Sequence, residues 1–425
     1  MPLLSSFCCY KKTTLSLLLK QKTYLLFKPN FQMIKKTYLM LFIIAVLTCC
    51  KSKETTPPKS NIIDFSTIVE KPTIFNGTDL FESIQYIPLE TKEGSLISGS
   101  PSPYITNNEI IIKQRKQMLR FERKTGKLIG EIGKQGNGPN EFDRTLWGVP
   151  FDEKNKTIIA KKKGGKSLIK YDLEGNVLDK FDAATSYGNT SFINDSIYAC
   201  YIPNLMGKQE TKINIFNNKG KTLTKFPNFQ SFSNTDNSIT ILAFEGILYR
   251  WNKQLYFKEA FNDTLFHVTK DALKPHYIFN FGKYATTYSK RNELLKQHVK
   301  QDGTKSQAVD KLFLGIHMVE SSKYLLHQYR YQKESYWACF DKEKQASASY
   351  KNNGNMTWKG SKNYPFKFNK TYINSKNELV TYMQAIDIIQ WFDEHPKAQL
   401  PESLKHLKKL TENDNPVIII AQLKH

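Results

Sequence analysis

Beyond residue 60, short apolar and aromatic runs alternate with polar turns along most of the chain. Runs of this length, bounded by Gly, Asn, Asp and Lys, are typical of β-strands joined by hairpins. Two segments instead predict helices, 288–299 and 379–392, the second with a continuation over 403–410. Ser289 is a candidate N-cap of the first, and Leu379, Met383 and Ile386 form an apolar stripe in the second. The pattern predicts an all-β fold with small helical insertions that cover it.

One unit recurs along this pattern: an aromatic residue, a charged turn that contains glycine, and a further strand. The clear copies lie at 119–129, 169–178 and 213–223, and their turn glycines, Gly126, Gly175 and Gly220, are 49 and 45 residues apart. A weaker copy lies at 336–344, and another strand pair at 254–268. A period of roughly 40–50 residues is typical of β-propeller blades, which bury both faces of each sheet by packing around an axis. We predict a six-bladed β-propeller over 61–425; glycine hairpins in another large β fold are the alternative.

The N-terminal region has the composition of an export signal. Lys35 and Lys36 follow Met33, and residues 38–47 form an apolar stretch too short to span a membrane comfortably. The following Leu47-Thr48-Cys49-Cys50 resembles a bacterial lipobox, which predicts lipid attachment at Cys50, or alternatively at Cys49. We therefore divide the chain into an upstream extension (1–32), a lipoprotein signal peptide (33–50), a polar tether (51–60) and the propeller (61–425). A longer signal or an uncleaved anchor helix is the alternative for residues 1–32.

The large net charge of the chain gives little information about its partners. The formal net charge is +23, of which seven lysines in residues 1–50 contribute +7, and the remaining charge is scattered as on a solvated surface. Because the export signal separates the chain from nucleic acid, we predict no nucleic-acid partner. An acidic polysaccharide or an anionic membrane face remains open for this surface and for the basic loop at 161–166. Cys200 and Cys339 lie in apolar runs and predict buried free thiols, with a disulfide as the alternative.

Three segments of the mature chain resemble the six-bladed propeller lipoproteins of Bacteroides-type bacteria. They are 84–91 as an opening strand, 130–142 with its Gly-Pro-x-Glu-aromatic ending, and 413–421 as a closing strand. The middle segment is also similar to a turn of NHL-repeat propellers, within a group of NHL/TolB-like propellers. The resemblance implies a lipid-anchored propeller closed by pairing its terminal strands in one blade. It implies no particular chemistry.

The glycine-rich turn is the sharpest local feature of the sequence. Its residues could cradle an anion with consecutive N–H groups, or could form a structural turn between blades in which the glutamate anchors backbone N–H groups. The turn comprises Gly133, Gly136, Gly138, Pro139, Glu141 and Phe142. No zinc-ligand spacing, phosphate-binding loop or Gly-x-Ser-x-Gly elbow occurs, and we predict no metal, cofactor or catalytic residues.

Two functions follow as hypotheses. The first is a non-enzymatic propeller at the bacterial cell envelope that is held to the membrane by its lipid anchor and binds a glycan, a peptide or an envelope protein. The second is an envelope enzyme, a lyase or hydrolase, with a site at one mouth of the propeller channel. The second needs histidine and carboxylate side chains that converge at that mouth, for example around a metal.

Overall fold

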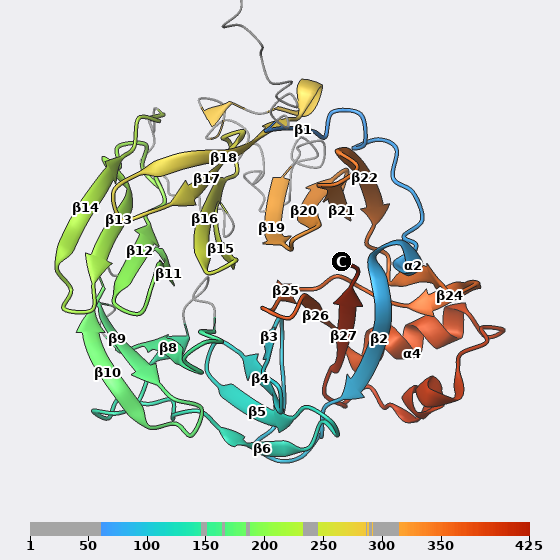
Figure 1. Ribbon diagram of the computed structural model, residues 1–425. Coiled ribbons are helices and arrows are strands. Elements are labelled where there is room, and N and C mark those ends of the chain that lie inside the picture. The colour runs from blue at the N-terminus through green and yellow to red at the C-terminus, as the bar shows by residue number, and fades with distance from the viewer. Residues whose placement is uncertain are drawn as a thin grey trace, which may run out of the picture. The chain divides into compact units, whose positions relative to one another are not determined.

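The structure is a computed structural model that describes residues 61–145, 151–163, 166–183, 188–232, 245–285, 287–288, 291 and 314–425. Within these residues the strands form six sheets of four or five strands and one separate two-stranded hairpin. The six sheets are arranged as blades around a central axis (Figure 1). The fold is therefore the six-bladed β-propeller that the repeat predicted.

The blades are numbered here in chain order, and the first strand of each lies nearest the axis (Figure 1). Blade 1 comprises β3 (Ser102–Ile105), β4 (Glu109–Lys113), β5 (Met118–Glu122) and β6 (Leu128–Glu131). Blade 2 comprises β7 (Arg144–Thr145), β8 (Ile158–Lys161), β9 (Ser167–Tyr171) and β10 (Val177–Asp182). Blade 3 comprises β11 (Asn189–Phe192), β12 (Ile197–Tyr201), β13 (Thr211–Asn217) and β14 (Thr222–Pro227).

The second half of the ring carries the additions to the basic blade. Blade 4 comprises β15 (Gly246–Trp251), β16 (Gln254–Glu259), β17 (Thr264–Val268) and β18 (Leu273–Asn280), with β1 (Ile62–Asp64) parallel to β18 as a fifth strand. Blade 5 comprises β19 (Leu314–Glu320), β20 (Tyr324–Tyr331), β21 (Glu334–Asp341) and β22 (Ala346–Lys351). Blade 6 comprises β25 (Tyr372–Ile373), β26 (Glu378–Met383), β27 (Val417–Leu423) and β2 (Phe81–Pro88).

Blade 6 closes the ring by joining the two ends of the propeller. Its outermost strand, β2, comes from the N-terminal side and pairs antiparallel with the C-terminal strand β27, with Tyr86 opposite Ile419. Both strands overlap the segments 84–91 and 413–421 that the sequence singled out as opening and closing strands. Because each blade hides its two faces against its neighbours, separate clusters of buried apolar side chains lie between successive blades.

The three repeated glycines occupy equivalent turns, between the third and fourth strands of blades 1, 2 and 3. Gly126, Gly175 and Gly220 have φ of +72°, +86° and +74°, a conformation that glycine adopts at little steric cost. At Gly126 a Cβ atom would also lie 2.0 Å from the carbonyl oxygen of Pro88 in blade 6. The weaker copy at 336–344 falls at the same place in blade 5, between β21 and β22.

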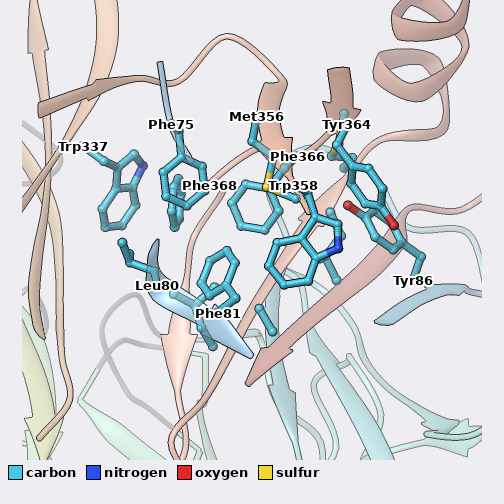
Figure 2. Close-up of a cluster of buried hydrophobic side chains, with 14 of the residues drawn as sticks. Phe75, Leu80, Phe81, Tyr86, Trp337, Met356, Trp358, Tyr364, Phe366 and Phe368 are labelled. Atoms are coloured by element: carbon cyan, nitrogen blue, oxygen red, sulfur yellow. The ribbon is translucent and has the colours of Figure 1, made fainter. Parts of the chain in front are cut away.

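Among the described residues, the largest cluster of buried apolar side chains lies between blades 5 and 6, where the hairpin of β23 (Asn355–Trp358) and β24 (Ser361–Pro365) is inserted. Figure 2 shows its rings packed around Phe366 and Phe368, which meet edge to face with ring centroids 4.8 Å apart. Two short helices, α2 (Gly77–Leu80) and α4 (Ala385–Glu394), and the 3-10 helix η4 (Glu402–Lys409) border this region. Trp391 of α4 donates a hydrogen bond to Asn355 of the hairpin at 3.2 Å, which ties the helix to the propeller.

The helix predicted over 379–392 is correct only in its second part. Leu379 and Met383 lie on β26, which pairs with β25 and β27, and the helix begins at Ala385. Residues four apart share one face of a helix and also one face of a strand, so their spacing does not separate the two structures. The predicted continuation over 403–410 is helical but forms the tighter η4, and a further 3-10 turn, η1, spans Gly282–Tyr284. The helix predicted at 288–299 lies almost entirely outside the described residues.

Candidate functional site: the central channel

A cavity of about 890 Å³ occupies the centre of the ring. All six innermost strands contribute to its wall, with Tyr104, Thr145, Asn189, Ile247, His317 and Tyr372 among the described lining residues. Its volume lies within the range of small-molecule sites in proteins, roughly 300–1,000 Å³. The channel is therefore the candidate functional site.

Basic side chains from blades 1 and 6 gather at one mouth of the channel. Lys113 is the last residue of β4 and is only 5% exposed, whereas Arg115 and Lys116 in the β4–β5 turn are exposed. Lys370, on the approach to β25, is exposed at the same mouth, and its ammonium donates to the carbonyl of Ser100 at 2.8 Å. The mouth thus presents exposed cations that lead to a buried one.

The ring of one tyrosine faces the buried lysine, and a second tyrosine packs against that ring. The Lys113 ammonium lies 5.6 Å from the ring centroid of Tyr104, and the rings of Tyr104 and Tyr372 meet edge to face at 5.0 Å. Burial, assisted by the positive charge of Lys370, lowers the pKa of Lys113 to about 7. Burial therefore disfavours the charged form of Lys113, and an anion bound nearby would favour it.

The rim of this mouth is held in place by glutamine side chains. Gln114 accepts a hydrogen bond from the backbone N–H of Ser98 at 2.9 Å, and Gln117 donates to the carbonyl of Gly94 at 2.9 Å. From blade 6, Gln384 donates to the carbonyl of Gly99 at 2.9 Å. The β2–β3 connection is therefore fixed over blade 1 from both sides, and the entrance is largely preformed.

The wall formed by blades 4 and 5 has a different character. Its described lining from β15 and β19 includes five aliphatic residues, of which Ile316 is partly exposed and Met318 is fully buried: Ile247, Leu248, Ile316, Met318 and Val319. His317 stands among them and donates a 2.5 Å hydrogen bond from Nε2 to the carbonyl of Thr371 in blade 6. Burial lowers the pKa of His317, which favours its neutral form at neutral pH. This wall is therefore apolar, and the basic wall lies at blades 6 and 1.

The two charged residues on the apolar side are already engaged by the protein. Arg250 donates to the carbonyls of Phe192 and Ile193 at 2.5 and 3.1 Å. Glu320 accepts a hydrogen bond from Tyr249 at 2.7 Å and pairs with Lys342 at 2.6 Å and with His276 at 3.2 Å. Burial alone would raise the pKa of Glu320, but the hydrogen bond from His276 and the charge of Lys342 lower it. The carboxylate therefore stays ionised with its charge offset.

The structure places the glycine-rich turn in the β6–β7 connection between blades 1 and 2, away from the residues that line the cavity. Glu141 folds back and accepts a 2.7 Å hydrogen bond from the backbone N–H of Gly138. A Cβ atom on Gly136 would lie 2.0 Å from the Glu141 carboxylate, so glycine leaves room for this contact. The carboxylate therefore occupies the space that an anion would need beside Gly136 and Gly138.

The remaining residues of this turn pack against blade 2. Phe142 is fully buried and meets the ring of Tyr171 edge to face at 6.2 Å. The Tyr171 hydroxyl donates to the carbonyl of Asn140 at 2.8 Å, and Lys162 donates to that of Pro139 at 2.5 Å. Gly133 has φ of +63°, and a Cβ atom there would lie 2.9 Å from the Tyr171 ring. These contacts give the turn a packing role between the two blades.

The cysteines of the chain fall into two groups. Cys49 and Cys50 lie outside the described residues. Cys200 and Cys339 are free and buried, as predicted, and burial raises the pKa of both thiols, to about 11 for Cys200. Among the described residues, no three His, Cys, Asp or Glu side chains are grouped so that they could hold a metal ion. No helix within the described ranges has the length and hydropathy to cross a membrane.

The principal residues of the channel were not predicted from the sequence. Lys113, Arg115 and Lys116 form a basic run directly after the apolar Ile110-Ile111-Ile112, and that abrupt change was a usable signal of a strand ending at a mouth. Lys370 and Tyr372 carry no comparable signal, because only closure of the ring brings blade 6 beside blade 1.

The fold and its cavity define a six-bladed β-propeller with a ligand-sized central channel. The chain belongs to the family described as "Domain of unknown function (DUF4934)", whose match covers residues 60–422. A comparison with curated protein sequences gives no match.

Solved structures from Bacteroides are similar to the chain. One is named "Putative exported protein" of Bacteroides fragilis, with a TM-score of 0.62 and 14% identity over 86% of this chain and 100% of that one. Another, a DUF4221 family member from Bacteroides vulgatus, has a TM-score of 0.49 and 11% identity over 81% of this chain and 97% of that one. The first likeness supports the propeller fold.

Proposed function

We propose that this protein is a lipoprotein of the bacterial cell envelope whose propeller binds a ligand in its central channel. The observation that carries the proposal is the cavity, which is ligand-sized, has a preformed rim and joins a basic wall to an apolar one. The export signal and the lipobox-like sequence at Cys50 support the envelope location, as does the printed name of the Bacteroides fragilis neighbour. The glycine-rich turn supports a kinship with NHL/TolB-like propellers.

The anchor can be tested apart from the ligand. Intact mass spectrometry of the native protein should show a mature chain that begins at Cys50 and carries lipid, found in the membrane fraction. Cys50→Ala should abolish the lipid and Cys49→Ala should retain it; the reverse pattern would move the site to Cys49. A mature form that keeps residues 1–48 without lipid would contradict the anchor.

The channel can be tested by filling it. Ser102 begins β3, lines the cavity and lies opposite Lys113 in the sheet, so Ser102→Trp should occupy the entrance. Ser196 is an exposed turn residue of blade 3 outside the described cavity lining, and Ser196→Trp is the matched control. Native mass spectrometry after incubation with an extract of envelope glycans and peptides should show a bound mass with the wild type and Ser196→Trp only. Equal binding to Ser102→Trp, or none to the wild type, would contradict the proposal.

An envelope enzyme, a lyase or hydrolase, is the second candidate, and Lys113 is the observation that favours it. An amine with a pKa of about 7 can act as a general base at neutral pH. Mass spectrometry of the same extract should then show products that form with the wild type and are absent with Lys113→Met. Elemental analysis would reveal a metal-dependent version. Unchanged extract in the presence of folded wild type would reject an enzyme acting on these substrates.

A further inference from the structure

We propose that the channel binds an amphipathic organic anion, with its acidic group at Lys113 and Lys370 and its apolar body against β15 and β19. The inference rests on the proposed function and names the chemistry of the ligand for the same cavity. Three features of the wall carry it: the sign of its charge, the depth at which one cation is buried, and the position of its aliphatic side chains.

The balance of charge favours a negative ligand. The described lining residues include five basic side chains, Lys113, Arg115, Lys116, Arg250 and Lys370, and one carboxylate, Glu320. The carboxylate is already paired with Lys342, and Arg250 is bound to backbone carbonyls. The four other cations come from blades 1 and 6: three lie at the end of β4 or in the β4–β5 turn, and one lies shortly before β25. Because charges of one sign at a low-dielectric cleft focus the field, this mouth should attract anions and repel cations.

The burial of Lys113 indicates where the acidic group of the ligand would bind. Arg115, Lys116 and Lys370 are exposed at the rim, whereas Lys113 is 5% exposed and lies behind them. A charge–charge interaction strengthens as water is excluded, so an anion gains most at the buried end of this series. Lys370 approaches the same point from blade 6 and has φ of +32°, a backbone conformation that lysine rarely adopts. The two lysines thus reach the entrance from both sides.

The aliphatic wall argues for an apolar body on the anion. Ile247 and Leu248 on β15, and Ile316, Met318 and Val319 on β19, line the channel on the side of blades 4 and 5. An inorganic anion would fill little of about 890 Å³ and would make no use of the aliphatic side chains that reach the cavity. Burial of apolar surface away from water stabilises a complex. A ligand with one acidic end and one apolar end matches both walls at once.

A pair of fluorescent probes separates the contribution of the acidic group to binding from that of the apolar body. 8-Anilinonaphthalene-1-sulfonate carries an apolar ring system and one sulfonate, and N-phenyl-1-naphthylamine has the same ring system without the charge. Titration of the folded wild type should show one site that prefers the sulfonate by at least about tenfold, the loss expected when a hydrogen bond to a charged group is removed. Equal affinity for the two probes, or no saturable site for the sulfonate, would overturn the inference.

Substitutions locate that site. Lys113→Met and Lys370→Met should each weaken the sulfonate by about tenfold or more and leave the neutral probe within twofold. Lys124→Met, in an exposed turn of blade 1 outside the channel, is the matched control and should leave both probes unchanged. Ile316→Ala should weaken both probes, because the apolar body is common to them. Lys370 is exposed, so its variant keeps the test decisive if Lys113→Met does not fold. Sulfonate binding that no lysine variant changes would place the site elsewhere.

This inference can fail while the proposed function stands. If Ser102→Trp loses the envelope ligand but neither lysine variant affects the sulfonate, then the channel binds a ligand of another chemistry. If Ser102→Trp also leaves ligand capture unchanged, both proposals fall together.

Discussion

The ammonium of Lys212 on β13 lies 2.6 Å from the Glu259 carboxylate on β16, and this buried ion pair joins blade 3 to blade 4. The Glu259 side chain is 1% exposed and that of Lys212 is 11% exposed. Removal of one partner leaves the other charge in a medium that solvates it poorly. The stability of the contact between blades 3 and 4 therefore depends on these two residues.

Lys212→Met should lower the free energy of unfolding by about 3 kcal/mol, because it leaves the Glu259 carboxylate buried without its cation. Urea denaturation followed by tryptophan fluorescence measures the change. Lys270→Met is the control, because Lys270 pairs with Asp271 at 3.5 Å at an exposed position and should contribute less than about 0.5 kcal/mol. Similar effects for the two variants would show that the buried pair has no special weight.

Gly126→Ala should destabilise the propeller by about 2–4 kcal/mol, because it combines a positive φ with a clash against the backbone of blade 6. Gly354 has φ of +88° but open space around its Cβ direction, so Gly354→Ala should cost only about 1 kcal/mol. The difference between their urea midpoints isolates the clash with Pro88. Equal midpoints would mean that the turn of blade 1 moves away from blade 6 at little cost.

Lys113 should make stability depend on pH above neutrality. Its pKa is about 7 in the folded protein and about 10.5 in the unfolded chain, so the unfolded chain binds more protons between these values. Stability should therefore rise with pH from about 7 to 10.5 relative to Lys113→Met. The surrounding Lys370, Arg115, Tyr104 and Tyr372 are common to both proteins. Urea titrations at several pH values measure the difference, and a gap that stays constant would contradict the lowered pKa.

Cys200 and Cys339 should resist alkylation in the native protein. Both are buried, and the raised pKa of each thiol keeps it protonated and unreactive at neutral pH. Peptide mapping after treatment with N-ethylmaleimide should find these two sites unmodified, then fully modified in concentrated urea. Ser196→Cys supplies an exposed positive control in the same protein. Rapid native labelling of either buried site would indicate local opening of its blade.

The repeating parts of the fold could be predicted from the sequence because they rest on local rules. A positive φ at Gly126, Gly175 and Gly220 marks one turn in each of three blades, and this period indicated a propeller. The first half of the predicted helix at 379–392 failed because the spacing of Leu379 and Met383 fits a strand as well. The local pattern of apolar residues does not reveal that β26 pairs with β25 and β27 in a sheet.

The candidate site was less predictable because it is assembled by ring closure. Lys113 and Lys370 are far apart in the sequence and lie in different blades, and only the pairing of β2 with β27 brings those blades together. The glycine-rich turn attracted attention for its composition, but its carboxylate is used within the turn itself. Conspicuous local composition identified a junction between blades, whereas the channel depends on long-range topology.

The pairing of β2 with β27 also makes the length of the chain matter during synthesis. β2 is made early, and the strand that completes its ladder lies at residues 417–423, so blade 6 stays unfinished until translation is almost over. A chain cut before Val417 would leave β2 and β26 with unpaired edges, which favour aggregation. Full-length and truncated products therefore differ, since only the former can pair β2 with β27 and close the ring.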